Sequence, residues 1–186
     1  MKIELIAPSS ALVVAHVLVA GALSLRILYR KLEVNTALAW IVMIIAMPFA
    51  GPILYPPPTF VYYKLAAVAR GIPVVEVPLS PRFELDEPAM HAAIARAKPS
   101  VVFLALPNNP TGTLWRMDFA LELAAAHRDT VIVSDEAYVA YSGKTNLGAL
   151  AGHPNLVVMR TLSKLGLAGL RVGYAISAPA IAHVLE

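Results

Sequence analysis

This chain of 186 residues contains no cysteine, few charged residues and no clusters of basic side chains. The absence of cysteine excludes disulfides, thiolate metal sites and cysteine nucleophiles. Charged residues make up 15% of the chain, against about 25% in typical soluble domains. The net charge is only +3, and lysine and arginine do not gather among aromatic residues, so the sequence predicts no nucleic-acid partner. The five histidines show no spacing typical of a metal site, and we expect no metal.

Apolar residues are abundant, at 58% of the chain. Such an excess indicates membrane segments or a deeply buried sheet, and the distribution along the chain predicts both. The character of the sequence changes near Tyr55–Pro58. We therefore predict two parts, a membrane hairpin over residues 1–55 and an α/β domain over residues 56–186.

Two apolar stretches dominate the first part, from Leu5 to Leu28 and from Ala37 to Tyr55. The second would be roughly 28 Å long as a helix, close to the roughly 30 Å hydrocarbon core of a bilayer. We predict an α-helical transmembrane hairpin with a basic link, located in the bacterial inner membrane. A cleavable signal peptide ending near Ala20–Ala22 is the alternative for the first stretch.

The second part alternates short β-rich runs with amphipathic stretches. Asp86 suits a helix N-cap and Pro88 a first turn, which predicts a helix through Ala97, and a second helix is expected over Met117–His127. The predicted strands are Val74–Val77, Val101–Leu106, Thr130–Ser134, Leu156–Arg160 and Val172–Ile176. Several of them are apolar throughout, which is typical of strands buried on both faces. The pattern predicts a mostly parallel sheet with flanking helices.

Reactive side chains follow three successive predicted strands. Pro107–Gly112 (Pro-Asn-Asn-Pro-Thr-Gly) follows the strand predicted over Val101–Leu106. Asp135–Tyr138 follows the strand over Thr130–Ser134, and Thr161–Lys164 follows the strand over Leu156–Arg160. The strand ends thus carry an amide, an acid with a phenol, and a hydroxyl with a lysine. Pyridoxal phosphate requires such groups: a lysine amine, a carboxylate for its ring nitrogen, and donors for its phenolic and phosphate oxygens. Each segment alone could be an ordinary turn, cap or surface charge. Their joint occurrence in this order favours a cofactor site.

These segments resemble fold-type-I aminotransferases that use pyridoxal phosphate, and in detail the histidinol-phosphate aminotransferase family. The resemblance runs from about Pro56 to the end of the chain. It implies that Lys164 holds the cofactor covalently and moves a proton, and that Asp135 pairs with the pyridine nitrogen. It also implies that Tyr138 and Asn109 donate to the phenolic oxygen. Lys164, Asp135 and Tyr138 would be the catalytic residues.

The same resemblance assigns the remaining cofactor contacts. Arg171, Ser163 and Thr161 would bind the phosphate. Phe60 occupies the position of the ring-stacking aromatic residue, or it fills the core. Tyr62, Tyr63 and Tyr141 are interpreted as packing residues. The implied partners are a glutamate-like amino donor and a keto phosphate acceptor, as in histidine biosynthesis.

Residues 36–55 resemble the second membrane helix of bacterial cardiolipin synthases. Their chemistry requires two His-x-Lys-x4-Asp motifs, and no histidine here is followed two residues later by lysine. This resemblance implies an anchor without phospholipid synthesis.

Members of the aminotransferase family are longer at both ends, form homodimers and work in the cytoplasm. Their upstream phosphate-gripping loop and their downstream substrate clamp have no counterpart here. We therefore expect a truncated large domain. The alternative is a non-catalytic, membrane-anchored fusion fragment.

Overall fold

A computed structural model describes residues 51–170 and 172–185 of the chain. The chain divides into two compact units, residues 1–36 and 37–186, and all described residues belong to the second. The strands are β1 (Ile53–Tyr55), β2 (Val74–Glu76), β3 (Val101–Ala105), β4 (Val131–Asp135), β5 (Leu156–Thr161) and β6 (Gly173–Ser177). The helices are α3 (Tyr62–Val68), α4 (Glu87–Ala97), α5 (Met117–Ala126), α6 (Val139–Ser142) and α7 (Pro179–Leu185), with short 3-10 turns η1 (Leu147–Gly152), η2 (Ser163–Leu165) and η3 (Ala168–Leu170).

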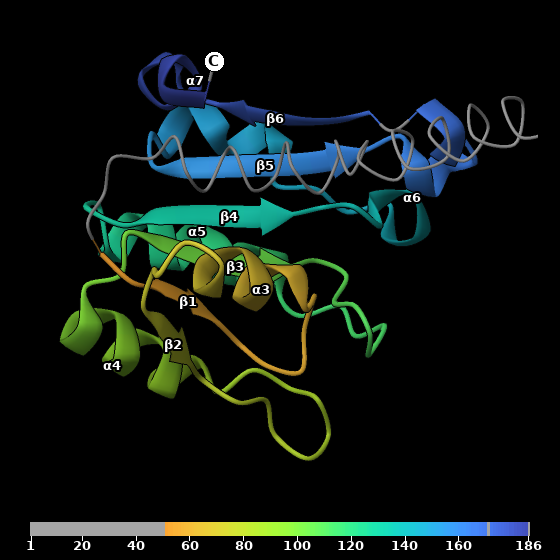
Figure 1. Cartoon of the computed structure of the whole chain (residues 1–186). Coiled ribbons are helices and arrows are strands. Elements are labelled where there is room, and N and C mark those ends of the chain that lie inside the picture. Colours follow the sequence, from red (N-terminus) through yellow and green to blue (C-terminus); the bar gives the residue numbers. More distant parts are fainter. Residues whose placement is uncertain (1–50, 171, 186) are drawn as a thin grey trace, which may run out of the picture. The chain divides into compact units, whose positions relative to one another are not determined.

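The strands form one six-stranded sheet in the order β2-β1-β3-β4-β5-β6 (Figure 1). The first five strands run parallel, and β6 pairs with β5 in the antiparallel direction. The predicted mostly parallel α/β sheet is therefore confirmed. The five predicted strands all form, with ends within one residue of the expected positions.

Alternate residues of the central strands point to opposite faces of the sheet, as the pleat requires. On β3, Val102 and Leu104 pack in the core cluster that contains residues of α4 and α5. Val101 and Phe103 pack in the cluster that contains residues of α3. Helices therefore cover both faces, with α3 on one side and α5 on the other (Figure 1). This double burial explains why the strands are apolar throughout.

Helix α4 begins as the sequence predicts. The carboxylate of Asp86 accepts a hydrogen bond of 2.9 Å from the backbone N–H of Ala89, and Pro88 lies in the first turn. Helix α5 follows the predicted range to within one residue. Capping of this kind satisfies a backbone donor that the helix itself leaves unpaired.

The predicted location in the bacterial inner membrane is wrong. Within residues 51–170 and 172–185, no helix is long and apolar enough to cross a membrane. Ile53–Tyr55, which the prediction placed at the end of the second membrane helix, form strand β1 between β2 and β3 and are buried. Their apolar character reflects burial in a covered parallel sheet. Residues 1–50 of the predicted hairpin lie outside the described residues.

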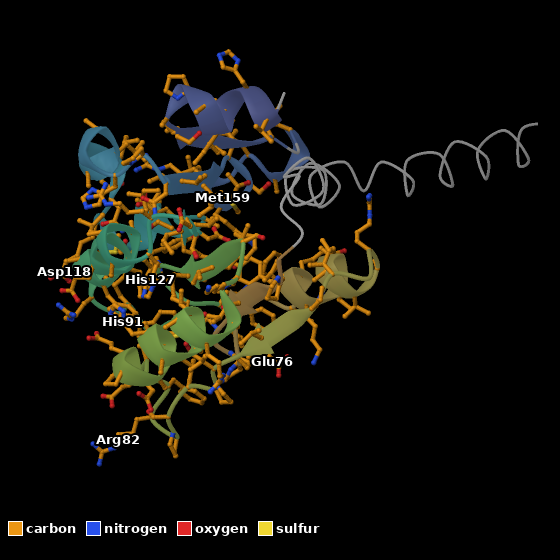
Figure 2. All side chains as sticks on the ribbon, turned by 90° about the vertical axis from the view of Figure 1, so that its left-hand side faces the viewer. Glu76, Arg82, His91, Asp118, His127 and Met159 are labelled. Atoms are coloured by element: carbon orange, nitrogen blue, oxygen red, sulfur yellow. The ribbon has the colours of Figure 1, made fainter. Side chains whose placement is uncertain are left out.

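Two histidines meet between α4 and α5, where Nδ1 of His91 lies 3.0 Å from Nε2 of His127 (Figure 2). Burial and the neighbouring His91 lower the pKa of His127. A folded-state pKa below the unfolded value of about 6.5 means that folding loses stability as the pH falls through that value. We expect the melting temperature to drop by about 2–4 °C between pH 7.5 and 5.5.

Thermal melts at several pH values test this expectation. The variant His127→Gln should lose much of the dependence. A matched variant, His153→Gln, should keep it, because His153 lies near η1 and bonds the Ala149 carbonyl instead. Equal slopes in all three proteins would contradict the role of the His91–His127 pair.

Candidate active site

The predicted site residues follow strands that end at the same edge of the sheet. Ala105 of β3 is level with Asp135 of β4, and Asp135 is level with Met159 of β5. Backbone hydrogen bonds continue this register past the strands, since the N–H of Leu106 donates to Asp135 and that of Glu136 donates to Met159, each at 2.8 Å. The carboxyl ends of parallel strands are where α/β proteins usually bind ligands.

The loop after β3 is tied to the segment before α3 by Asn108. Its side chain is 2% exposed. Its Nδ2 donates to the Pro58 carbonyl (3.0 Å) and the Thr111 hydroxyl (2.8 Å), and its Oδ1 accepts from Thr59 (2.6 Å). Asn109, the predicted cofactor contact, is only half-buried. The role of Asn109 stays a prediction. No role was predicted for Asn108, because nothing in the local sequence indicates that its side chain turns inward.

Gly112 closes this loop. Its φ of 71° lies in the left-handed region that favours glycine, and its N–H donates to the Asn108 carbonyl at 2.8 Å. The loop is therefore a defined turn that leaves Asn109 at the edge of the sheet.

Phe60 packs in an aromatic group at the start of α3. Its ring stacks on Tyr62, with centroids 5.5 Å apart, and meets Tyr63 edge-on at 5.6 Å. It also packs against the core cluster on the α3 face of the sheet. The core-filling alternative is thus observed, while a stacking role on a cofactor ring stays a prediction.

Asp135 is a buried carboxylate, 7% exposed, at the end of β4. Its Oδ2 accepts from the Tyr63 hydroxyl at 2.6 Å, and its Oδ1 accepts from the Ala137 N–H at 3.0 Å. Burial raises its pKa, while these two hydrogen bonds lower it and the charge of Glu136 raises it. A buried acid with two donors can hold a negative charge opposite a cationic ligand atom.

Tyr63, which the sequence led us to interpret as a packing residue, contacts the candidate site. Tyr63 is 3% exposed, and its ring stacks on Phe103 of β3 with centroids 4.5 Å apart. Burial and the neighbouring Asp135 raise its pKa well above 10, so its hydroxyl stays protonated and donates. Tyr63 and Asp135 are 72 positions apart in the sequence, so no local motif could have linked them.

Lys164 and Tyr138 come together although they follow different strands. Lys164 is exposed in η2 after β5, and its Nζ lies 5.0 Å from the centre of the Tyr138 ring. Tyr141 donates a long hydrogen bond of 3.4 Å to the Lys164 carbonyl. An ammonium at this distance from an aromatic ring is attracted to its π face. The structure therefore brings the predicted lysine and phenol to one place.

The predicted phosphate contacts are placed in part. The Thr161 hydroxyl donates to the Val172 carbonyl at 3.2 Å and accepts from the Ser163 N–H at 3.1 Å. Thr161 therefore holds the turn that carries Ser163 and Lys164, a function that was not predicted from the sequence. Arg171 lies outside the described residues.

Behind this edge, Glu136 lies in a buried polar network that the sequence also did not reveal. Its side chain is fully buried, and its Oε2 accepts from Nη2 of Arg160 at 3.0 Å and from the Thr145 hydroxyl at 2.7 Å. Its Oε1 accepts from the Asn146 N–H at 2.7 Å. The network fixes the residue that follows Asp135.

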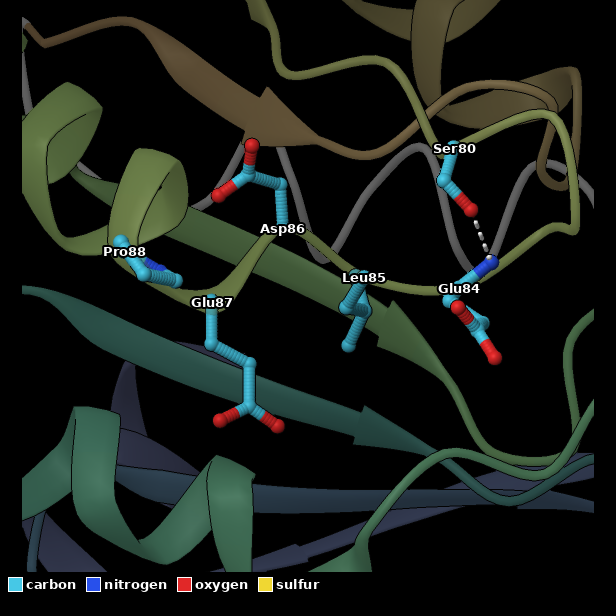
Figure 3. A pocket seen from close by; sticks show the side chains of 6 residues that line it. All are labelled: Ser80, Glu84, Leu85, Asp86, Glu87 and Pro88. Atoms are coloured by element: carbon cyan, nitrogen blue, oxygen red, sulfur yellow. Dashed lines mark hydrogen bonds between the residues drawn. The ribbon is translucent and has the colours of Figure 1, made fainter.

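A surface hollow of about 440 Å³ lies elsewhere, on the segment that leads into α4 (Figure 3). Its lining includes no predicted site residue and consists of Ser80, Glu84, Leu85, Asp86, Glu87 and Pro88. Within it, Ser80 Oγ accepts from the Glu84 N–H at 3.1 Å. Across the described part of the chain, no group of three or more acidic or histidine side chains is placed to hold a metal ion.

Known proteins resemble most of the chain. A family model described as aminotransferase class I and II matches residues 35–186. The histidinol-phosphate aminotransferase of Polaromonas naphthalenivorans is 46% identical over 134 residues, which is 70% of this chain and 36% of that protein. The histidinol-phosphate aminotransferase 1 of Burkholderia lata is 46% identical over 143 residues, which is 75% of this chain and 40% of that protein. The chain thus spans well under half the length of these relatives.

Solved structures share the fold. Histidinol-phosphate aminotransferase from Sinorhizobium meliloti, in complex with pyridoxal-5'-phosphate, aligns with a TM-score of 0.68 and 29% identity over 77% of this chain and 41% of that one. The enzyme of the same name from Clostridium acetobutylicum aligns with a TM-score of 0.71 over 86% of this chain and 52% of that one, at 22% identity, which speaks for the fold alone.

The family match also bears on the predicted hairpin. It begins at residue 35, so it includes the whole stretch, residues 36–55, that resembled a membrane helix of cardiolipin synthases. Neither that resemblance nor a membrane-anchored fusion fragment is supported.

Proposed function

Because the chain belongs to the class I and II aminotransferase family, we propose that it forms the cofactor-binding part of a pyridoxal-phosphate transaminase of the histidinol-phosphate aminotransferase kind. The observation that carries the proposal is the shared edge of β3, β4 and β5. There the buried carboxylate of Asp135 and the amine of Lys164 beside Tyr138 follow neighbouring strands. Relatives named for this activity are 46% identical to the chain.

The residues present fit pyridoxal phosphate. A carboxylate offers about four acceptor positions, and Tyr63 and Ala137 fill two of those on Asp135. The remaining positions suit the protonated ring nitrogen of the cofactor. Lys164 is exposed, so its amine is accessible to the carbonyl carbon of the cofactor. When bound, the cofactor supplies the electron sink that stabilises negative charge on the substrate carbon.

The proposal gives each site residue a defined role. Lys164 holds the cofactor and carries a proton on Nζ, and Asp135 keeps the ring nitrogen protonated. Tyr138 and Asn109 donate to the phenolic oxygen. The phosphate contacts would be Arg171, Ser163 and Thr161, and Phe60 would pack against the ring.

The proposed substrates follow the names of the relatives. We propose a glutamate-like amino donor and a keto phosphate acceptor similar to imidazole-acetol phosphate. The same family relation suggests a second copy of the chain as a partner.

Cofactor binding tests the proposal directly. We expect a visible absorbance band when pyridoxal phosphate is added to the purified chain. Reduction with sodium borohydride should then fix a label that peptide mass spectrometry locates at Lys164. A folded protein that shows neither the band nor the label would refute the proposal. Free lysines that react at random would instead spread the label over many peptides.

A further inference from the structure

We propose that Tyr63 is a positioning residue for the proposed transaminase site: its hydroxyl holds the Asp135 carboxylate ionised and turned toward the position of the cofactor ring nitrogen. This inference rests on the proposed function and assigns a task to a residue outside the motifs at the strand ends. It starts from the 2.6 Å hydrogen bond between Tyr63 Oη and Asp135 Oδ2.

The ring of Tyr63 is held firmly enough for such a task. It stacks nearly parallel on Phe103, at an interplanar angle of 16°, and meets the ring of Phe60 edge-on at 83°. Tyr55 packs against it at 6.2 Å between centroids. Aromatic contacts on several sides leave the ring little freedom to rotate away. The hydroxyl therefore stays aimed at the carboxylate.

The electrostatic balance at Asp135 makes this donor important. Burial is the main influence on the Asp135 pKa and raises it, which favours the neutral acid. Glu136 adds to this effect, although Arg160 pairs with its charge. The hydrogen bonds from Tyr63 and from the Ala137 N–H oppose it. A neutral acid could not hold a proton on a ring nitrogen as an anion can, so loss of the Tyr63 hydroxyl should weaken the pairing.

The carboxylate geometry leaves room for the cofactor. Tyr63 occupies one acceptor position on Oδ2, and Ala137 occupies one on Oδ1. Each oxygen keeps a second position. Two fixed donors on two different oxygens set the plane of the carboxylate, and that plane decides where a ring N–H can bind.

Carboxyl NMR of the full-length chain measures this effect without the cofactor. The sequence contains four aspartates, Asp86, Asp118, Asp129 and Asp135, so carbon-13 labelled aspartate gives few signals, and Asp135→Asn assigns the relevant one. In Tyr63→Phe, the titration midpoint of Asp135 should rise by about 1–2 pH units, because a hydrogen bond to the charged form is lost. An unchanged midpoint would overturn the inference.

Tyr55→Phe is a matched control. Tyr55 is also 3% exposed and donates to a carboxylate, Glu76, at 2.6 Å. Its replacement removes a similar hydrogen bond and should leave the Asp135 midpoint unchanged. If Tyr63→Phe does not fold, 3-fluorotyrosine incorporated into the unmodified sequence gives a stronger donor and should lower the midpoint. No lowering would then contradict the inference.

Cofactor binding supplies a second readout. In Tyr63→Phe, affinity for pyridoxal phosphate should fall by about tenfold near pH 6 and by less near pH 8, because the neutral fraction of Asp135 grows as the pH falls. Equal losses at both pH values would indicate a purely structural role. If the unmodified chain binds no pyridoxal phosphate, the proposed function fails, while the carboxyl titration still decides the inference about Tyr63.

Discussion

Replacing Lys164 with alanine should abolish the covalent capture of pyridoxal phosphate. The unmodified chain should carry about one borohydride-fixed label, and Lys164→Ala should carry none, because among the described residues no other side chain at the shared strand edge offers an amine to the cofactor carbonyl. Lys164 is exposed in η2, with its Nζ over the Tyr138 ring. Its replacement removes few packing contacts, so the fold should persist. Visible absorbance and peptide mass spectrometry give the measurement.

Lys144→Ala is the matched control for this prediction. Lys144 is also exposed, in the loop that follows α6. Unlike Lys164, it does not come directly after the end of a strand. Its replacement should leave both the absorbance band and the label in place. A label that persists in Lys164→Ala, or disappears in Lys144→Ala, would show that the lysine has been assigned wrongly.

Replacing Glu136 with alanine should destabilise the fold by about 3–5 kcal/mol, because it leaves the positive charge of Arg160 unpaired in a largely buried position. Arg160 would lose both of its hydrogen bonds to Glu136, and its side chain is only 19% exposed. Asn146 and Thr145 would each lose an acceptor as well. Since small domains are stable by about 5–15 kcal/mol, the loss should be evident as a much lower midpoint in urea unfolding.

Two further variants separate burial from charge pairing. Arg160→Ala combined with Glu136→Ala should cost less than the sum of the single changes, since the double variant leaves no unpaired charge. Glu122→Ala removes an exposed ion pair with Arg116 and should leave the midpoint nearly unchanged. Strict additivity of the two changes at Glu136 and Arg160 would contradict coupling between them.

Sequence patterns predicted most of the sheet correctly, because burial on both faces leaves a clear apolar record in β3, β4 and β5. The same apolar pattern led to a wrong prediction for β1, as the end of a membrane helix. Ile53–Tyr55 follow a long apolar stretch, and an apolar run alone does not distinguish a buried strand from the end of a membrane helix. Pairing with β2 and β3 distinguishes the two, and pairing is a long-range property.

The residues of the candidate site also fall into two groups, those that local sequence predicts and those that only long-range contacts reveal. The positions of Lys164, Asp135 and Tyr138 at the shared edge could be predicted, because each stands at the end of a strand or within three residues after it, in a segment with its own motif. Tyr63 and Asn108 could not. Their importance comes from hydrogen bonds to Asp135 and Thr59, which lie 72 and 49 positions away in the chain.

The sequence by itself determined strands β2 to β6, helices α4 and α5, the family, and which reactive groups stand at the strand ends. These properties depend on local patterns of apolar residues, caps and turns. The tertiary structure alone decided that β1 belongs inside the sheet, that Tyr63 donates to Asp135, and that Glu136 pairs with Arg160. The physical reason is that hydrogen bonds and ion pairs between distant segments depend on distances that only the packed sheet and its helices set.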